Sequence, residues 1–316
     1  MSRIAFLLML SLALGLPASA FTVDWVTVGD PGNACETQAE GCFGAVANGF
    51  RIGKYEVTNA QYAEFLNAVA VDDTNGLYNT DMGFDQILRG GAPGNYTYTA
   101  FGGNENKPIT SFSFYDALRF ANWLHNGQPS TGAQDASTTE DGAYLFTGPS
   151  TVGARKVSAQ VFLPTENEWY KAAYYNAGSA SYFDYPAGSN TQTTCSAPTA
   201  TPNRANCSSA SMIFAVGSYT GSPSPYVTFD QGGNVWEWNE TIISGGRGVR
   251  GGTCCTPFAD PTFLAAATRF SNDPLAEENL VGFRVAPEPG SLLQLACGSV
   301  ALLGLARKTR RRIASA

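Results

Sequence analysis

Apolar residues recur at helical spacing in three stretches of the chain, each behind a polar residue suited to begin a helix. These polar residues are Thr58, Ser113 and Thr165, and Gln, Asp or Glu follows three positions later in each case. Residues three and four apart share one helix face, so each stretch predicts an amphipathic helix, and Gly127 ends the second. The apolar stripes are Tyr62, Phe65, Leu66 and Val69, then Phe114, Ala117, Leu118, Ala121 and Leu124, and then Trp169, Ala172 and Ala173.

Alternating apolar and polar residues predict short strands between these helices. The intervening stretches are rich in Gly, Asn, Ser and Thr and predict turns and loops. The pattern therefore predicts a mixed fold with much irregular structure, and no internal repeat is visible. The predicted strands are 21–28, 50–57, 156–163, 247–253, 263–270 and 282–285, with 96–98 extended, and the loop-rich stretches are 71–107, 128–153 and 176–211.

The sequence Gly-Gly-Asn-Val-Trp-Glu-Trp-Asn at 232–239 places a carboxylate between two tryptophans. In an extended strand, Trp236 and Trp238 share one face, and Glu237 shares the other with Val235. The residue pattern alone favours a short strand in a globular core, with Glu237 either in a salt bridge or solvated.

Composition limits the class of protein. The 316 residues are 44% hydrophobic and 14% charged, with 34 Gly and 17 Pro, which suits one large domain or two ordinary ones with many turns. The formal net charge is −7. An acidic protein is a poor candidate for nucleic-acid binding, and its charge suits cations or neutral polymers such as glycans.

The first 20 residues predict a secretory signal peptide. Arg3 precedes an apolar run, 4–16, and Ala18 and Ala20 fit a small-residue cleavage site. We therefore expect an exported protein. An N-terminal membrane anchor is the alternative, for which the apolar run is short.

The C-terminal end combines Pro-Glu-Pro at 287–289, an apolar segment at 291–306 and a basic tail at 307–312. This order resembles the PEP-CTERM sorting signal of Gram-negative bacteria that carry exosortases. The resemblance implies that 287–316 inserts transiently in the inner membrane, meets exosortase-type sorting machinery, and leaves the body, residues 21–286, in the cell envelope, at the cell surface or outside the cell. A plain C-terminal anchor gives the same topology without cleavage.

Six cysteines lie in the expected mature body, where an oxidising compartment favours disulfides. Their spacing favours two local pairs, Cys35 with Cys42 and Cys195 with Cys207. The remaining two, Cys254 and Cys255, are adjacent, which leaves a vicinal disulfide or two separate fates open.

Eight motifs in a fixed order carry a family resemblance over about residues 22–286. They are YEVTN at 55–59, NKPI at 106–109, DA at 116–117, LPTENEW at 163–169, GNVWEW at 233–238, RGGT at 250–253, Arg269, and GFR at 282–284. Together they resemble the formylglycine-generating-enzyme (sulfatase-modifying factor) family. The resemblance implies an α+β fold, an irregular mixed relative of C-type-lectin-like domains with little regular secondary structure.

Enzymes of that family oxidise a cysteine of a client sulfatase to formylglycine, using molecular oxygen and copper held by two cysteines. The matching positions here are Thr256 and Pro261, which carry no thiol. Cys254 and Cys255 lie nearby, but adjacent residues of a strand point to opposite faces, which disfavours one two-sulfur copper site. We therefore expect no copper, and Cys254 and Cys255 are the alternative catalytic residues.

Histidine chemistry has little support in this chain. Other members of the superfamily use iron held by histidines, but His125 is the only histidine here. His125 lies at the end of the second predicted helix, where the negative end of the helix dipole favours a histidine side chain. No Gly-x-Ser-x-Gly motif accompanies it that would indicate a serine hydrolase.

Calcium is the metal that the resemblance supports. Family members hold structural calcium partly through the GNVWEW-like segment, which implies the side chains of Asn234 and Glu237 with backbone carbonyls near Gly232 and Val235. The second family site falls at 203–212, which contains no acidic residue. An ion pair between Glu237 and an arginine such as Arg250 is the alternative.

We expect an exported, surface-sorted protein that acts as a binding or structural module rather than an enzyme, with an extracellular polysaccharide or a client protein as its partner. The alternative is a formylglycine-generating-type oxidoreductase that uses Cys254 and Cys255 on a protein cysteine. A third interpretation is an inert component of the cell envelope. A nucleic-acid partner is not expected.

Overall fold

The computed structural model describes residues 21–207, 212–255, 257 and 259–288. The expected signal peptide, 1–20, lies outside the described residues, as do 289–316 and with them the expected membrane segment. In the part of the chain that is described, the helices are too short or too polar to span a bilayer.

Three α-helices form where the sequence predicts them. They are α1 (Asn59–Val69), α2 (Phe114–His125) and α3 (Glu166–Tyr174). Each begins with a complete capping box. The side chain of the capping residue accepts from the backbone N–H of the third helical residue, and the side chain of that third residue accepts from the backbone N–H of the capping residue. Every apolar residue of the three predicted stripes is buried. The helix predictions are therefore confirmed.

The strands are short and most of them pair only in twos. Two 3-10 helices, η1 (Thr80–Phe84) and η2 (Pro261–Leu264), lie among them. The strands are β1 (Trp25–Val28), β2 (Glu36–Gln38), β3 (Gly41–Phe43), β4 (Phe50–Gly53), β5 (Ile87–Gly90), β6 (Thr97–Ala100), β7 (Phe146–Gly148), β8 (Thr151–Val152), β9 (Val161–Phe162), β10 (Tyr175–Asn176), β11 (Ser181–Tyr182), β12 (Thr194–Cys195), β13 (Arg204–Ala205), β14 (Trp236–Ile243), β15 (Gly246–Arg250), β16 (Phe270–Asn272), β17 (Val281–Gly282) and β18 (Ala286–Pro287).

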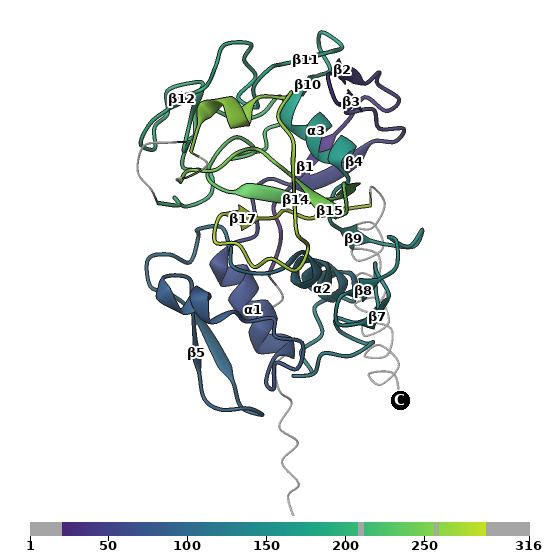
Figure 1. The fold of residues 1–316 in the computed structure, drawn as a ribbon, viewed down its shortest axis with the longest axis vertical. Coiled ribbons are helices and arrows are strands. Elements are labelled where there is room, and N and C mark those ends of the chain that lie inside the picture. Colours follow the sequence, from purple (N-terminus) through teal and green to yellow (C-terminus); the bar gives the residue numbers. More distant parts are fainter. Residues whose placement is uncertain (1–20, 208–211, 256, 258, 289–316) are drawn as a thin grey trace, which may run out of the picture.

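One four-stranded sheet forms the centre of the molecule, in the order β16-β15-β14-β17. Strand β14 carries the Trp-Glu-Trp segment and is antiparallel to β15 but parallel to β17. Helices α1 and α2 lie on one side of this sheet and α3 lies on the other (Figure 1). The mixed α+β fold with little regular structure agrees with the expectation from the sequence.

Aromatic side chains fill the core between α1, α2 and the sheet. Phe65 of α1 meets Phe120 of α2 edge to face with 5.3 Å between ring centroids, and Phe120 meets Phe283 in the same way at 5.3 Å. On the sheet, Trp238 packs edge to face on Phe114, at the start of α2, with 5.7 Å between centroids. Such pairs each contribute about 0.5–1.5 kcal/mol beyond the burial of their area.

Two predicted strands are largely wrong for a local reason, and a third, at 282–285, keeps only Gly282, at the end of β17. The prediction at 263–270 yields only the start of β16, because Pro261 suits the first helical position and the side chain of Asp260 accepts from the Thr262 N–H, which together begin η2. The prediction at 156–163 shrinks to β9, because the Ala159 N–H bonds to the Lys156 carbonyl and closes a turn. In both cases local hydrogen bonds outweigh apolar alternation.

The two expected disulfides are present. Cys35 pairs with Cys42 across the β2–β3 hairpin, and Cys195 pairs with Cys207. Of the two outcomes left open for Cys254 and Cys255, the structure shows the vicinal disulfide.

Candidate functional site

The carboxylate of Glu237 is fully buried and forms an ion pair with Arg284. Arg284 Nε and Nη2 each lie 2.6 Å from one of its two oxygens, and Trp169 Nε1 donates to Oε2 at 2.7 Å. Glu237 lies opposite Arg250 in the β14–β15 register. The guanidinium of Arg250 nevertheless turns to Glu166, with Nε 2.7 Å from Oε1. The arginine that pairs with Glu237 is therefore Arg284 and not Arg250.

A buried carboxyl group, Glu56, and a half-buried one, Asp230, lie near this ion pair. Burial, with Asp230 and Glu237 nearby, raises the pKa of Glu56 well above its usual value. Burial also raises the pKa of Asp230 to about 6. The Asp230 carboxylate accepts from the Gly217 N–H at 2.5 Å, whereas Glu56 Oε2 has no hydrogen-bond partner among the described residues. A low-dielectric environment that already holds one ion pair disfavours further negative charge.

Asn234 is buried and joins three loops. Its backbone adopts φ 62°, a left-handed conformation that asparagine tolerates better than most residues. Its Oδ1 accepts from Asn206 Nδ2 and from the Phe214 N–H, each at 3.0 Å. Its carbonyl accepts from the Cys254 N–H at 3.0 Å and from Thr253 Oγ1 at 3.1 Å. Asn234 therefore fixes the backbone that carries the vicinal disulfide.

The residues named for calcium lie together on this segment but have other partners. Both oxygens of Glu237 are engaged by Arg284 and Trp169, and Oδ1 of Asn234 receives two N–H donors. Gly232 packs against Pro186 and Leu264, and Val235 is fully buried. As arranged here, these atoms do not fit a calcium ion, because Arg284 already supplies the positive charge. Calcium binding at this segment stays a prediction, and it requires the Arg284 guanidinium to move.

The sulfurs expected as the alternative catalytic pair are bonded to each other. Cys254 is fully buried and Cys255 is half-buried. A two-thiolate copper site needs two free sulfurs converging on one ion, and this donor set does not offer them. Of the two positions that match the family's copper ligands, Pro261 begins η2 and Thr256 lies outside the described residues.

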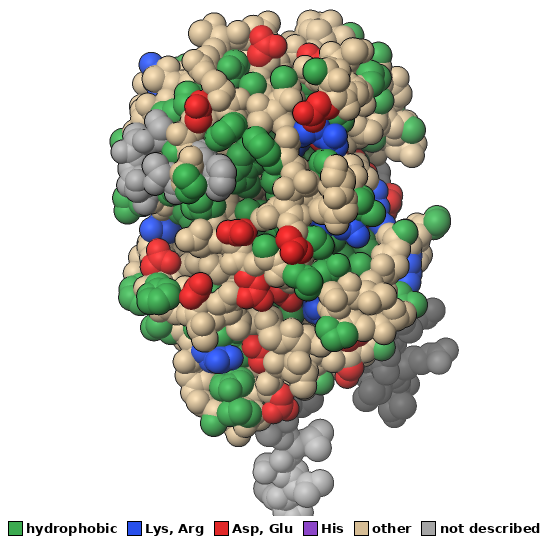
Figure 2. Space-filling view, in the orientation of Figure 1, with side chains coloured by type: hydrophobic (Ala, Val, Ile, Leu, Met, Phe, Trp, Pro, Cys, Tyr) green, Lys and Arg blue, Asp and Glu red, His purple; other side chains and the backbone are tan. Residues whose placement is uncertain are grey.

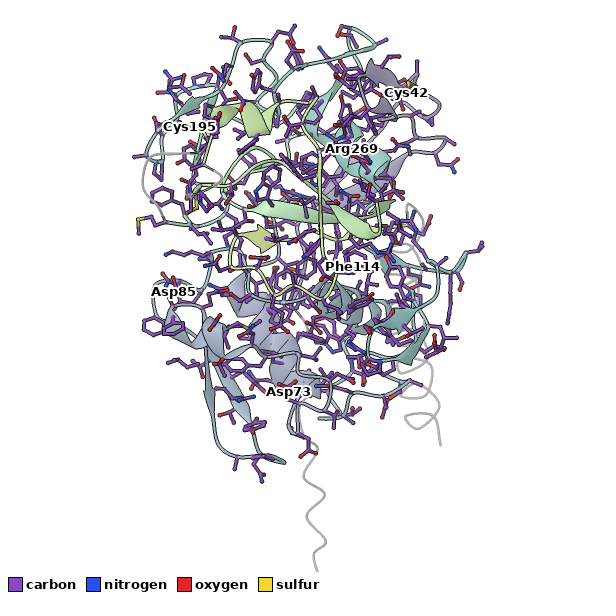
Figure 3. The ribbon with its side chains drawn as sticks, viewed as in Figure 1. Cys42, Asp73, Asp85, Phe114, Cys195 and Arg269 are labelled. Carbon is purple, nitrogen blue, oxygen red and sulfur yellow. A yellow bond between two sulfur atoms is a disulfide. The ribbon has the colours of Figure 1, made fainter. Side chains whose placement is uncertain are left out.

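A groove of about 530 Å³ opens beside Cys255. Asn59, at the start of α1, and Thr110 form part of its buried floor, while Asp85 and Lys107 lie on its rim (Figure 3 labels Asp85). The sequence analysis did not identify this groove. Asn59 belongs to the first family motif and Lys107 to the second, but only the folded chain brings them within reach of Cys255.

His125 is the last residue of α2, where the sequence places it. Its Nδ1 accepts from the Gln160 N–H at 2.9 Å. Burial, with a contribution from Lys156, lowers the pKa of His125. Among the described residues no group of three or more His, Cys, Asp or Glu side chains is arranged to hold a metal ion.

The family motifs converge around α3 and the central sheet. Arg250 and Arg269 both contact Glu166, with Arg269 Nε 2.8 Å from Oε1. Figure 3 shows Arg269 on the α3 side of the sheet and Phe114 on the α2 side. The ion pairs of Glu166 and Glu237 therefore hold α3 and the Gly-Phe-Arg segment to β14 and β15.

These features define an irregular α+β domain whose short elements are joined by buried ion pairs. The sulfatase-modifying factor enzyme 1-like domain (FGE-sulfatase) matches residues 32–289, most of the chain. The chain belongs to this family. No curated protein matches it.

Solved structures agree on the fold. Treponema denticola variable protein 1 is 19% identical, with a TM-score of 0.54 over 85% of this chain and 98% of that one. The structure of CarF is 18% identical, with a TM-score of 0.52 over 84% of this chain and 98% of that one. At this level of identity the likeness concerns the fold alone.

Proposed function

We propose that this protein is an exported binding module of the sulfatase-modifying factor family that does not carry out cysteine oxidation. The observation that carries the proposal is the bond between Cys254 and Cys255, which leaves no thiolate pair beside the groove. The acidic composition and the polar groove support a neutral extracellular partner such as a polysaccharide. Structural calcium is not needed for this proposal.

Export and sorting form the second part of the proposal. The N-terminal segment, 1–20, and the tail, 287–316, support secretion followed by exosortase-type processing and a final place in the envelope, at the surface or outside the cell. Three described disulfides suit such an oxidising compartment.

The alternative is an oxidoreductase that acts on a protein cysteine through Cys254 and Cys255. One observation favours it, because Cys255 lines the groove and is half-buried, so a reductant could reach its sulfur. Reduction would free the Cys255 thiol at the edge of a cavity large enough for a peptide side chain and leave the Cys254 thiol buried.

Incubation with a Cys-x-Pro-x-Arg peptide, copper and oxygen separates these functions. We expect no formylglycine by mass spectrometry, with or without prior reduction of the protein. Oxygen-dependent turnover that disappears in both Cys254→Ser and Cys255→Ser would establish the oxidase instead.

Protein taken from its native host tests sorting, since we expect an intact mass that lacks residues 310–312.

A further inference from the structure

The groove beside Cys255 adjoins a second hollow, and the two share Leu280. The larger, of about 530 Å³, is lined mainly by polar residues. The smaller, of about 200 Å³, is mainly apolar and contains Trp236 and Phe270. A ligand extending across Leu280 would therefore meet hydrogen-bonding groups at one end and aromatic surface at the other.

The floor of the larger hollow carries two buried polar atoms without partners. Asn59 and Thr110 are both fully buried, and Asn59 Oδ1 and Thr110 Oγ1 form no hydrogen bond with any described residue. Their positions are fixed, because Asn59 Nδ2 donates to the Asn104 carbonyl at 2.9 Å and the Thr110 N–H donates to Gln86 Oε1 at 2.9 Å. Buried polar atoms are nearly always hydrogen-bonded, so this pair indicates a ligand or water that supplies donors.

The rim of the larger hollow carries both signs of charge. Asp81 and Asp85 are exposed, Lys107 is half-buried, and none of the ion pairs in the described chain uses them. Acidic side chains gather across the middle of this face (Figure 2). An anion would meet these carboxylates, and a cation would meet the Lys107 ammonium. A hydroxyl group both donates and accepts, so it suits carboxylate, ammonium and the Asn59 amide oxygen together.

Apolar surface adjoins these polar groups. Phe84 and Met212, which line the larger hollow, are 81% and 48% exposed. In the smaller hollow, Phe270 is 45% exposed and meets Trp236 edge to face at 5.3 Å. The C–H faces of a sugar ring are apolar and its edge carries hydroxyls, so one sugar ring matches both kinds of surface.

A peptide fits the larger hollow less well. Its lining comes from α1, η1 and loops and includes no residue of a named strand. Extended peptides are commonly held by backbone hydrogen bonds to an open sheet edge, which the larger hollow does not offer. The smaller hollow does include residues of β16 and β17, the edge strands of the central sheet, so peptide binding is one outcome of the test below. We propose that the two hollows together bind a neutral polyhydroxylated ligand, a short stretch of a neutral oligosaccharide. This proposal rests on the proposed binding function and assigns that function to a site.

The decisive variant is Thr110→Val. Valine keeps the shape of threonine and replaces the hydroxyl, which has no partner among the described residues, with a methyl group, so we expect the melting temperature to stay the same or rise. The full chain, purified in detergent, would be applied to an array of neutral, anionic and cationic oligosaccharides and to a peptide panel. We expect neutral oligosaccharides to bind wild type, and Thr110→Val to bind them roughly tenfold or more weakly.

Thr138→Val is the matched control. Thr138 is fully buried, does not line either hollow, and donates from Oγ1 to the Ala133 carbonyl at 2.8 Å. We expect this substitution to lower the melting temperature and to leave oligosaccharide affinity unchanged. The pair of variants therefore separates a loss of ligand contact from a loss of stability.

Three results would overturn the assignment. Neutral oligosaccharides that bind Thr110→Val as tightly as wild type would place the ligand elsewhere and leave the proposed binding function intact. Binding of peptides or charged glycans alone would replace the ligand class, and no binding on either panel would remove the binding function as well.

Discussion

Glu237 shows how tertiary context assigns a partner to a single side chain. Alternation along β14 places Glu237 away from the two tryptophans, but the nearest arginine across the ladder, Arg250, contacts Glu166. Arg284, 47 positions further along the chain, supplies the charge instead. An isolated buried carboxylate is costly, and two hydrogen bonds from one guanidinium offset that cost.

We predict that Glu237→Gln lowers stability by about 3 kcal/mol, because it leaves the Arg284 charge buried without its direct partner. Chemical denaturation followed by tryptophan fluorescence measures this change. Repeating the measurement with added calcium and with a chelator tests whether calcium also contributes at this segment.

Glu105→Gln is the control for charge alone, since Glu105 is exposed and forms no ion pair in the described structure. A wild-type melting temperature that falls on chelation, with no such fall in Glu237→Gln, would instead establish calcium at this segment. The ion pair with Arg284 would then describe only the calcium-free state.

At the scale of elements, the loop between α3 and β14 depends on a covalent link. Its strands β12 and β13 are two residues each and pair in parallel, Thr194 with Arg204 and Cys195 with Ala205. Two such short strands provide few hydrogen bonds, and the disulfide between Cys195 and Cys207 closes the intervening loop. The same loop supplies Asn206, whose side chain donates to Asn234, and the Asn234 carbonyl accepts from the Cys254 N–H. The loop therefore helps to position the vicinal disulfide.

We predict that the double substitution Cys195→Ser and Cys207→Ser lowers stability by about 3 kcal/mol, because the sulfurs are 12 positions apart and the link restricts the unfolded chain. Thermal unfolding measured by circular dichroism tests this value. The disulfide between Cys254 and Cys255 closes almost no loop. The double substitution Cys254→Ser and Cys255→Ser should therefore lower stability clearly less. Equal losses in the two variants would contradict the loop-entropy explanation.

At the scale of the molecule, several carboxyl groups that are buried or half-buried have raised pKa values. Burial raises the pKa of Asp116 to about 7, although hydrogen bonds from Ser113 oppose the shift. Burial also raises the pKa of Glu240 to about 7, while Arg155 and the hydroxyl of Tyr144 oppose it. The pKa of Asp230 is also raised, to about 6. The folded protein therefore holds protons that the unfolded chain releases.

We predict that stability falls as the pH rises from about 4 to about 7. The folded-state pKa values of Asp116, Asp230 and Glu240 lie above the unfolded values, so these groups favour the folded state at low pH and lose that contribution through this window. Urea denaturation at a series of pH values measures the slope. Glu240→Gln should reduce the slope, and a stability that rises steadily over this range would contradict the prediction.

Local signals explain which elements were predictable. The capping residues Thr58, Ser113 and Thr165 act on N–H groups three positions away, so α1, α2 and α3 could be recognised without knowledge of the fold. The spacing of Cys35 and Cys42 likewise predicted a local pair, which in the structure links the β2–β3 hairpin. Strands such as 263–270 were not predictable in this way, because a strand also needs a neighbour at the right register.

By itself, the sequence determined the helices, the two local disulfides and the family, because each depends on residues close in the chain or on motifs in a fixed order. Only the tertiary structure decided the partner of Glu237, the bond between the two adjacent cysteines and the groove beside Cys255. These depend on residues such as Asn59, Thr110 and Arg284 meeting from distant parts of the chain. Burial and electrostatic pairing arise from that packing, so no local pattern could specify them.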